Sequence, residues 1–108
     1  MSLPEIPDSP TLPQLQQYQA DICKARGWDQ TSLLQTWLLF SEEIGELATA
    51  IRNHQKLYQE AGKENQPELQ GEFADVLSYL MELANSCGVD LEAAYRMKEE
   101  VNKGREWG

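Results

Sequence analysis

The chain has 108 residues, with 18 acidic against 9 basic side chains, a formal net charge of −9 and a hydrophobic content of 41%. This length suits one domain with three or four helices around one core, and the hydrophobic content is that of a folded chain. The negative charge argues against a protein that binds a phosphate backbone through a broad basic surface. We therefore predict one domain and no nucleic-acid partner.

The first 13 residues form a Pro-rich segment, which we expect to be a flexible arm ahead of a helical domain at 14–108. The segment has neither the cationic start nor the apolar stretch of a secretory signal. No apolar run in the sequence approaches the roughly 20 residues of a membrane span. We predict a soluble, cytoplasmic protein that does not contact a membrane, with Cys23 and Cys87 reduced.

Apolar residues at three- and four-residue intervals predict four helices. The first lies near residues 12–26 and stops at Gly27, and the second runs from about 32 to 54. The third covers about 68–86, after a polar connector that contains Gly62, Asn65 and Pro67, and Gly88 is well placed to end it. The fourth begins after Val89 with Asp90 as its N-cap, and we expect Leu91, Ala94, Tyr95 and Val101 to face inward. The expected fold class is an all-α, four-helix bundle.

The second predicted helix is apolar on nearly every side of its first half. Leu33, Trp37 and Phe40 lie on one stripe, while Leu38 and Leu39 extend the apolar surface round the helix. So small a chain has too few elements to cover such a surface. We therefore predict that a second copy of the chain covers it, in a homodimer or homotetramer.

Acidic residues flank the apolar stripes of the second and third helices. At roughly 100° per residue, Glu43 and Glu46 lie beside the stripe of the second helix, with Glu42 further round. Glu72 and Asp75 lie beside the stripe of the third helix, followed by Tyr79 on the same edge. If these helices pack antiparallel, Glu43, Glu46, Glu72 and Asp75 meet, and their repulsion raises their pKa values unless a cation lies among them.

Ligands that are all carboxylates suit Mg²⁺ or Mn²⁺ rather than zinc, and Mg²⁺ held in this way commonly also binds phosphate oxygens of a substrate. The alternative is that both clusters are solvated helix faces, which is the commoner role of acidic runs. Because both clusters lie beside an apolar stripe rather than opposite it, the metal site is favoured.

One edge of the fourth helix offers complementary charge. Lys98, Asn102 and Arg105 lie at positions i, i+4 and i+7, where two cations and an amide could bind a polyphosphate. The alternative is surface pairing with Glu99 or Glu106. Ahead of the second helix, Trp28 could stack on a nucleobase or cover the core.

The motif "EEIGE" at 42–46, followed by "EFAD" at 72–75 and "VLSYL" at 76–80, resembles the MazG-like, all-α nucleoside triphosphate pyrophosphohydrolase superfamily. The likeness extends from the first helix to Arg105, and it is strongest to the dCTP pyrophosphatase branch. It implies a MazG-like bundle that cleaves a nucleoside triphosphate between its α and β phosphates with Mg²⁺, giving a monophosphate and pyrophosphate.

The resemblance also implies roles for single residues. Glu43, Glu46, Glu72 and Asp75 would be metal ligands, and Glu42 together with Glu43 would serve catalysis, Glu42 as an outer ligand or a base that orients water. The other implied contacts are to the substrate: Trp28 to the base, Tyr79 to the sugar, and Lys98, Asn102 and Arg105 to the phosphates.

Two alternatives stay open. One is phosphoribosyl-ATP pyrophosphohydrolase activity on the same scaffold. The other is an acidic helical module without catalysis, which binds a partner protein through the apolar half of the second helix.

Overall fold

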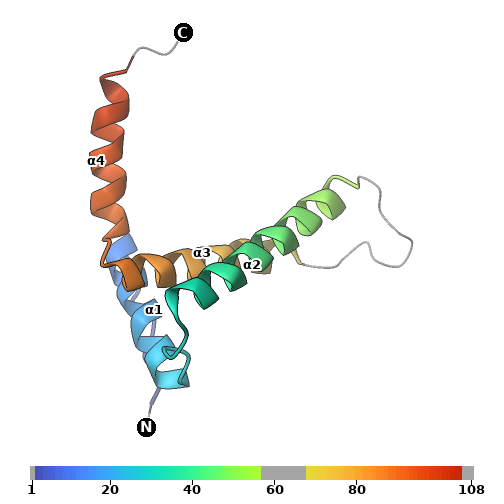
Figure 1. Ribbon diagram of the computed structural model, residues 1–108, viewed down its shortest axis with the longest axis horizontal. Coiled ribbons are helices and arrows are strands. Elements are labelled where there is room, and N and C mark those ends of the chain that lie inside the picture. Colours follow the sequence, from blue (N-terminus) through green and yellow to red (C-terminus); the bar gives the residue numbers. More distant parts are fainter. Residues whose placement is uncertain (1, 57–67, 106–108) are drawn as a thin grey trace. The chain divides into compact units, whose positions relative to one another are not determined.

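The computed structural model describes residues 2–56 and 68–105, and within these ranges the chain is helical and contains no strand. The predicted all-α fold with four helices is confirmed (Figure 1). The helices are α1 (Leu12–Arg26), α2 (Leu33–His54), α3 (Leu69–Cys87) and α4 (Leu91–Lys103). The predicted turn residues Gly62, Asn65 and Pro67, and Glu106 as an ion-pair partner, lie outside the described residues.

Side chains at the helix starts explain where the helices begin. Thr11 accepts a hydrogen bond from the backbone N–H of Gln14, whose side chain accepts one from the N–H of Thr11. Ser32 and Gln35 form the same reciprocal pair ahead of α2. Such pairs satisfy backbone donors that have no partner within the helix. Helix α1 therefore begins at Leu12, inside the range expected for the arm.

Two glycines end helices in the left-handed backbone conformation, which residues with a Cβ rarely adopt. Gly27 has φ 74° after α1, and Gly88 has φ 68° after α3. At both ends the next residue donates a backbone hydrogen bond back into the helix, Trp28 to Cys23 at 2.8 Å and Val89 to Ala84 at 2.9 Å. The stops that the sequence predicts at these glycines are confirmed.

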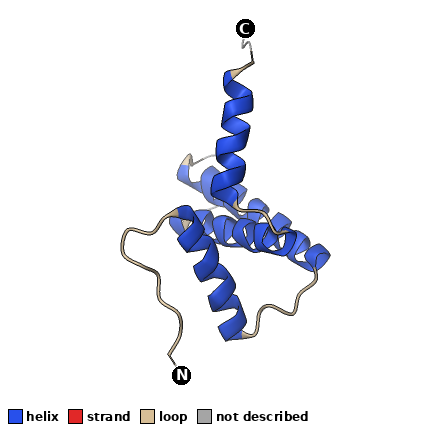
Figure 2. Ribbon diagram, turned by 90° about the vertical axis from the view of Figure 1, so that its left-hand side faces the viewer, coloured by secondary structure: helices blue, strands red, loops and turns tan. Residues whose placement is uncertain are grey.

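The chain divides into two compact units. One runs up to Gln30 and resumes at Ala84, so it contains α1, the last turn of α3, and α4, with α1 packed against α4. The other covers residues 31–83 and contains α2 with most of α3. In this second unit, α2 and α3 run side by side in opposite directions (Figures 1 and 2).

Few apolar side chains are buried in the single chain. Among the described residues these are Ile22, Cys23, Ala50, Met81 and Ala84. Much of the predicted core is exposed instead, including Tyr95 (72%) and Val101 (49%), which we expected to face inward. The physical reason is that one chain has too few helices to cover more than one side of each.

The exposed apolar residues follow a heptad spacing on α2. We call Leu33, Trp37, Phe40, Ile44, Leu47 and Ile51 the α2 seam; they are separated by four and three residues in turn. Four of the six are exposed, and Trp37 packs on Phe40 with ring centroids 5.8 Å apart. Helix α3 carries a shorter exposed row with the same spacing, Phe73, Leu77 and Leu80, which we call the α3 seam.

None of the helices in the described ranges is long and apolar enough to cross a membrane. Cys23 is buried and Cys87 is exposed, and neither forms a disulfide in the described part of the chain.

Candidate metal centre

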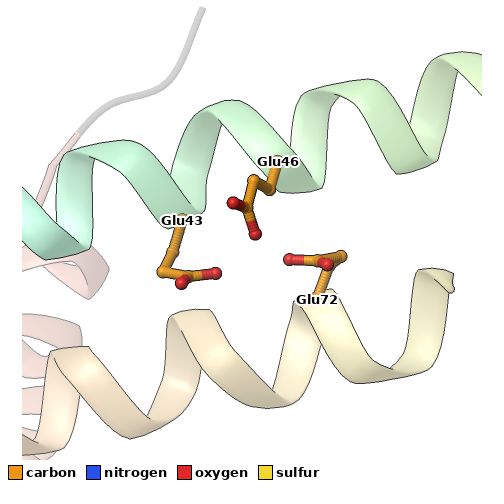
Figure 3. A group of neighbouring side chains, drawn as sticks. All are labelled: Glu43, Glu46 and Glu72. Atoms are coloured by element: carbon orange, nitrogen blue, oxygen red, sulfur yellow. The ribbon is translucent and has the colours of Figure 1, made fainter. Parts of the chain in front are cut away.

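Three glutamates from α2 and α3 point toward one another across the space between the helices (Figure 3). Each of Glu43, Glu46 and Glu72 offers one carboxylate oxygen, and these three oxygens lie within 4.8 Å of one another. Glu43 and Glu46 are one turn apart on α2, and the antiparallel course of α3 brings Glu72 opposite them. The meeting of these three acids, which the sequence predicts, is thus found in the structure.

Two of the three carboxylates are shielded from solvent. Glu72 is only 9% exposed and Glu43 is half-buried. The Oε2 atoms of Glu43 and Glu72 are both buried and have no hydrogen-bonding partner in the described part of the chain. A buried charged oxygen without a partner is unfavourable, so binding a proton or a cation would stabilise these atoms.

Burial raises the pKa of Glu43 to about 7, and the negative charges of Glu46 and Asp75 add to this rise. The pKa of Glu72 is raised by the same causes in the same order: burial first, then Glu46 and Asp75. The direction agrees with the sequence prediction. The larger cause is burial, however, and the sequence argument had named repulsion alone.

Asp75 and Glu42 lie at the margin of this group. Asp75 is exposed and does not belong to the cluster of three oxygens, but its charge raises the pKa of both buried glutamates, so it lies near them. Glu42 is exposed on α2 and also lies outside the three-oxygen cluster. Tyr79 is half-buried on α3, one turn beyond Asp75.

The other predicted substrate contacts belong to the unit that contains α1 and α4. Lys98 is exposed and Asn102 is half-buried on α4, Arg105 is exposed just after it, and Trp28 follows α1. In both ribbon views, α4 leads away from α1, so the segment after α1 and the far end of α4 lie at opposite ends of this unit (Figures 1 and 2). The single chain therefore does not bring Trp28 and the α4 residues together.

One contact was not anticipated from the sequence. The guanidinium carbon of Arg26 lies 4.9 Å from the centroid of the Trp28 ring, while Trp28 remains 56% exposed. The two residues are separated by Gly27, whose left-handed conformation turns the chain. An Arg-Gly-Trp sequence at a helix end is the signal that could have indicated this cation–π contact.

The donor set fits a hard divalent cation. The three clustered side chains offer carboxylate oxygens and no imidazole or thiolate, which suits Mg²⁺ or Mn²⁺ better than softer metals. The two orphaned oxygens give such an ion ready ligands, and its charge would offset the repulsion among the acids.

The profile of the MazG nucleotide pyrophosphohydrolase domain matches residues 31–104, a range that holds the four predicted metal ligands, Lys98 and Asn102 but leaves out Trp28 and Arg105. Human dCTP pyrophosphatase 1 is 34% identical over 102 residues, which cover 89% of this chain and 59% of the human protein. The rat protein of the same name is 36% identical with the same coverage.

A phage enzyme is similar over a shorter range. The dATP/dGTP diphosphohydrolase of cyanophage S-2L is 38% identical over 66 residues, which cover 61% of this chain and 50% of the phage protein. The chain thus spans about 59% of the length of the mammalian relatives.

Proposed function

The chain belongs to the MazG nucleotide pyrophosphohydrolase domain family, and from this premise we propose that it cleaves a nucleoside triphosphate between the α and β phosphates with the aid of Mg²⁺. The products are a nucleoside monophosphate and pyrophosphate. The observation that carries the proposal is the pair of buried, unpartnered oxygens on Glu43 and Glu72, within a cluster of carboxylates that a divalent cation would stabilise.

The residues that would hold the cation are Glu43, Glu46, Glu72 and Asp75. When bound, Mg²⁺ would supply positive charge for the phosphate oxygens and for the leaving pyrophosphate, and would increase the acidity of water. Glu43 and Glu72 would bind the cation in their charged forms, so its positive charge would oppose the rise in their pKa values.

We assign the remaining roles to side chains outside the cluster of three carboxylates. Glu42, exposed next to Glu43 on α2, accepts a hydrogen bond from the attacking water and orients it. Lys98, Asn102 and Arg105 donate hydrogen bonds to the phosphate oxygens. No protein nucleophile is required, because the reaction is a direct displacement by water.

Trp28 and Tyr79 contact the nucleoside in this proposal. Because the single chain does not bring Trp28 and the α4 residues together, different copies of the chain supply these contacts to one nucleotide. Trp28 stacks on the base, with one side of its ring covered by Arg26, and Tyr79 contacts the sugar. The named relatives act on dCTP and on dATP and dGTP. We propose a deoxynucleoside triphosphate as substrate, with dCTP or a modified relative of it to be tested first.

We also propose that a second copy of the chain covers the exposed seams. On each helix the seam is rotated from the acids by about 100°, as Ile44 is from Glu43 on α2 and Phe73 is from Glu72 on α3. The two helices are antiparallel. The α2 and α3 seams therefore share one side of the pair, and two such pairs can form a four-helix interface by heptad packing. The large side chains exposed there offer an apolar surface that a second copy of the chain would cover.

The test is pyrophosphate release from a panel of ribo- and deoxynucleoside triphosphates, with Mg²⁺ and with a chelator. We expect pyrophosphate rather than orthophosphate, only with Mg²⁺. Glu46→Gln removes one carboxylate charge with little change in shape, and it should lower kcat/KM by at least about a hundredfold, because a catalytic metal contributes several kcal/mol.

The matched control is Asp21→Asn, which removes the charge of an exposed acid on α1 and keeps an oxygen that can accept from Gln17. This variant should retain wild-type rates, and both variants should keep the helical circular dichroism spectrum. Wild-type turnover in Glu46→Gln, or undiminished turnover in the chelator, would contradict the proposed metal centre.

A further inference from the structure

A buried amide on α1 binds the corner between α3 and α4. The side chain of Gln16 is 7% exposed, and its Nε2 donates hydrogen bonds to Oδ1 of Asn85 at 3.0 Å and to the carbonyl oxygen of Val89 at 2.6 Å. Its Oε1 accepts from the backbone N–H of Leu91 at 3.0 Å. In return, Nδ2 of Asn85 donates to the carbonyl oxygen of Gln16 at 3.1 Å. We call Gln16 and Asn85 the amide clasp.

The amide clasp ties three elements of one unit together. Asn85 belongs to the last turn of α3, Val89 to the turn, and Leu91 is the first residue of α4. The N–H of Leu91 is one of the donors that a helix start leaves without an intrahelical partner, and Gln16 satisfies it while Asp90 caps the N–H of Ala93. Both the position and the direction of the first turn of α4 are therefore set from α1.

Helix α4 is held at its first turn, so a small change in its direction there becomes a larger displacement further along the helix. It has no buried residue in the single chain. Lys98 and Asn102 lie seven and eleven residues beyond Leu91, which corresponds to about 10 and 17 Å along the axis. A tilt of about 10° at the base would move Asn102 by about 3 Å, and a displacement of even 1 Å can reduce the rate of a positioned reaction strongly.

We infer that the amide clasp is a positioning device for substrate binding: Gln16 and Asn85 hold α4 in the direction in which Lys98 and Asn102 reach the phosphates of the nucleotide. The inference rests on the proposed function. Neither clasp residue touches the substrate, so their effect passes through α4. A purely structural amide pair would affect only the stability of the fold, whereas a positioning pair also changes the KM for the nucleotide.

The test compares Gln16→Leu with Gln19→Leu. Gln19 is equally buried on α1 (8% exposed), but its amide donates to Sγ of Cys23 on the same helix. The Gln16→Leu variant should raise the KM for the nucleotide at least about fivefold with kcat within about twofold, because ground-state contacts to the phosphates are lost. Gln19→Leu should leave KM unchanged.

Hydrogen exchange gives a readout that does not depend on activity. Peptides from α4 should exchange faster in Gln16→Leu than in wild type or Gln19→Leu, because the base of the helix is released. The rise in melting temperature on adding Mg²⁺ should be the same in all three proteins, since the carboxylates lie on α2 and α3.

The double variant Gln16→Leu/Asn85→Leu should raise KM no further than Gln16→Leu alone, because both changes break the same clasp.

An unchanged KM in a folded Gln16→Leu variant would overturn the inference, and so would unchanged exchange in α4. If Gln16→Leu does not fold, Asn85→Asp tests the same point: it keeps the acceptor for Gln16 and removes the donor to the carbonyl oxygen of Gln16. If the wild-type protein releases no pyrophosphate, the proposed function has failed, and hydrogen exchange alone still shows whether the amide clasp holds α4.

Discussion

At Glu43, burial and two neighbouring carboxylates act in the same direction on one proton. The pKa of this residue is raised from 4.5 to about 7, so near pH 7 the folded chain holds a proton that the unfolded chain has released. A proton and the proposed divalent cation would compete for the same oxygens. This competition would couple the stability of the fold to both pH and metal concentration.

The stability of the metal-free protein should therefore fall as pH rises. Between about pH 4.5 and 7 the folded state binds more protons than the unfolded state, and a group with a raised carboxyl pKa loses stabilisation over this range. We expect the melting temperature in a chelator to be lower at pH 8 than at pH 5.5. The increase on adding Mg²⁺ should be larger at pH 8, where fewer protons compete.

A Glu43→Gln variant isolates this residue from the general effect of the net charge of −9. It should show a weaker fall in melting temperature between pH 5.5 and pH 8 than wild type, whereas Asp21→Asn should follow wild type. A pH dependence that is the same in all three proteins would contradict the raised pKa of Glu43.

At the residue scale, the sequence predicted which acids lie close together, but not the main cause of their raised pKa values or the contact of Arg26 with Trp28. Spacing predicted the helix edges on which Glu43, Glu46 and Glu72 lie, since helical periodicity fixes which side chains share an edge, and the antiparallel packing assumed for the two helices brings these edges together. It could not show that burial would outweigh repulsion in raising their pKa values, because burial depends on packing between helices. The same holds for the contact of Arg26 with Trp28, which arises from the turn at Gly27.

At the scale of elements, the corner between α3 and α4 depends on one backbone conformation. Gly88 has φ 68°, and no atom lies within 4 Å of the position that a Cβ would occupy. Replacing it by alanine should therefore cost conformational energy alone, of about 1 kcal/mol. Chemical denaturation should show this loss for Gly88→Ala.

Gly45→Ala is the matched control. Gly45 lies within α2, has no positive φ and also has open space at the Cβ position. Alanine there should stabilise the protein by about 0.5–1 kcal/mol, because glycine is a poor helix former. Equal effects of the two substitutions would show that the conformation of Gly88 does not matter.

The helix boundaries were predictable because their signals are local. Ser32, Asp90, Gly27 and Gly88 each act on backbone groups within a few residues. The inward side of α4 was not predictable in this way. Tyr95 and Val101 fit an apolar stripe, but what covers a stripe is decided by elements far away in the sequence or by another chain, and in the single chain they are exposed.

For the whole molecule, the stability of the single chain depends on how much of its apolar surface is buried. Ala50 and Met81 are the buried apolar side chains in the described part of the unit that contains α2, while most of the α2 seam and the α3 seam are exposed. So small a core is insufficient for a stable fold of this length. Folding and association are therefore expected to be linked.

Trp37→Glu should disrupt this association. Trp37 is 51% exposed at the centre of the first half of the α2 seam, and a charge there would be buried without a partner in the assembly. Sedimentation should show a dimer or tetramer for wild type and a smaller or partly unfolded species for the variant. Met97→Glu, at a 68% exposed apolar residue of α4, should keep the wild-type mass. A monomeric wild-type protein would contradict the proposed interface.

The position of the α2 seam beside the acids has a consequence for how the sequence can change in length. Ile44 follows Glu43 directly, so the angle around α2 between its apolar side and its acidic side is fixed by their spacing in the sequence. Inserting or deleting one residue between Leu33 and Glu46 would rotate one part of the helix by about 100° against the other, and either the carboxylates or the first half of the seam would turn away. Related chains should therefore tolerate substitutions in this stretch but keep its length, and should place insertions in the segments between helices.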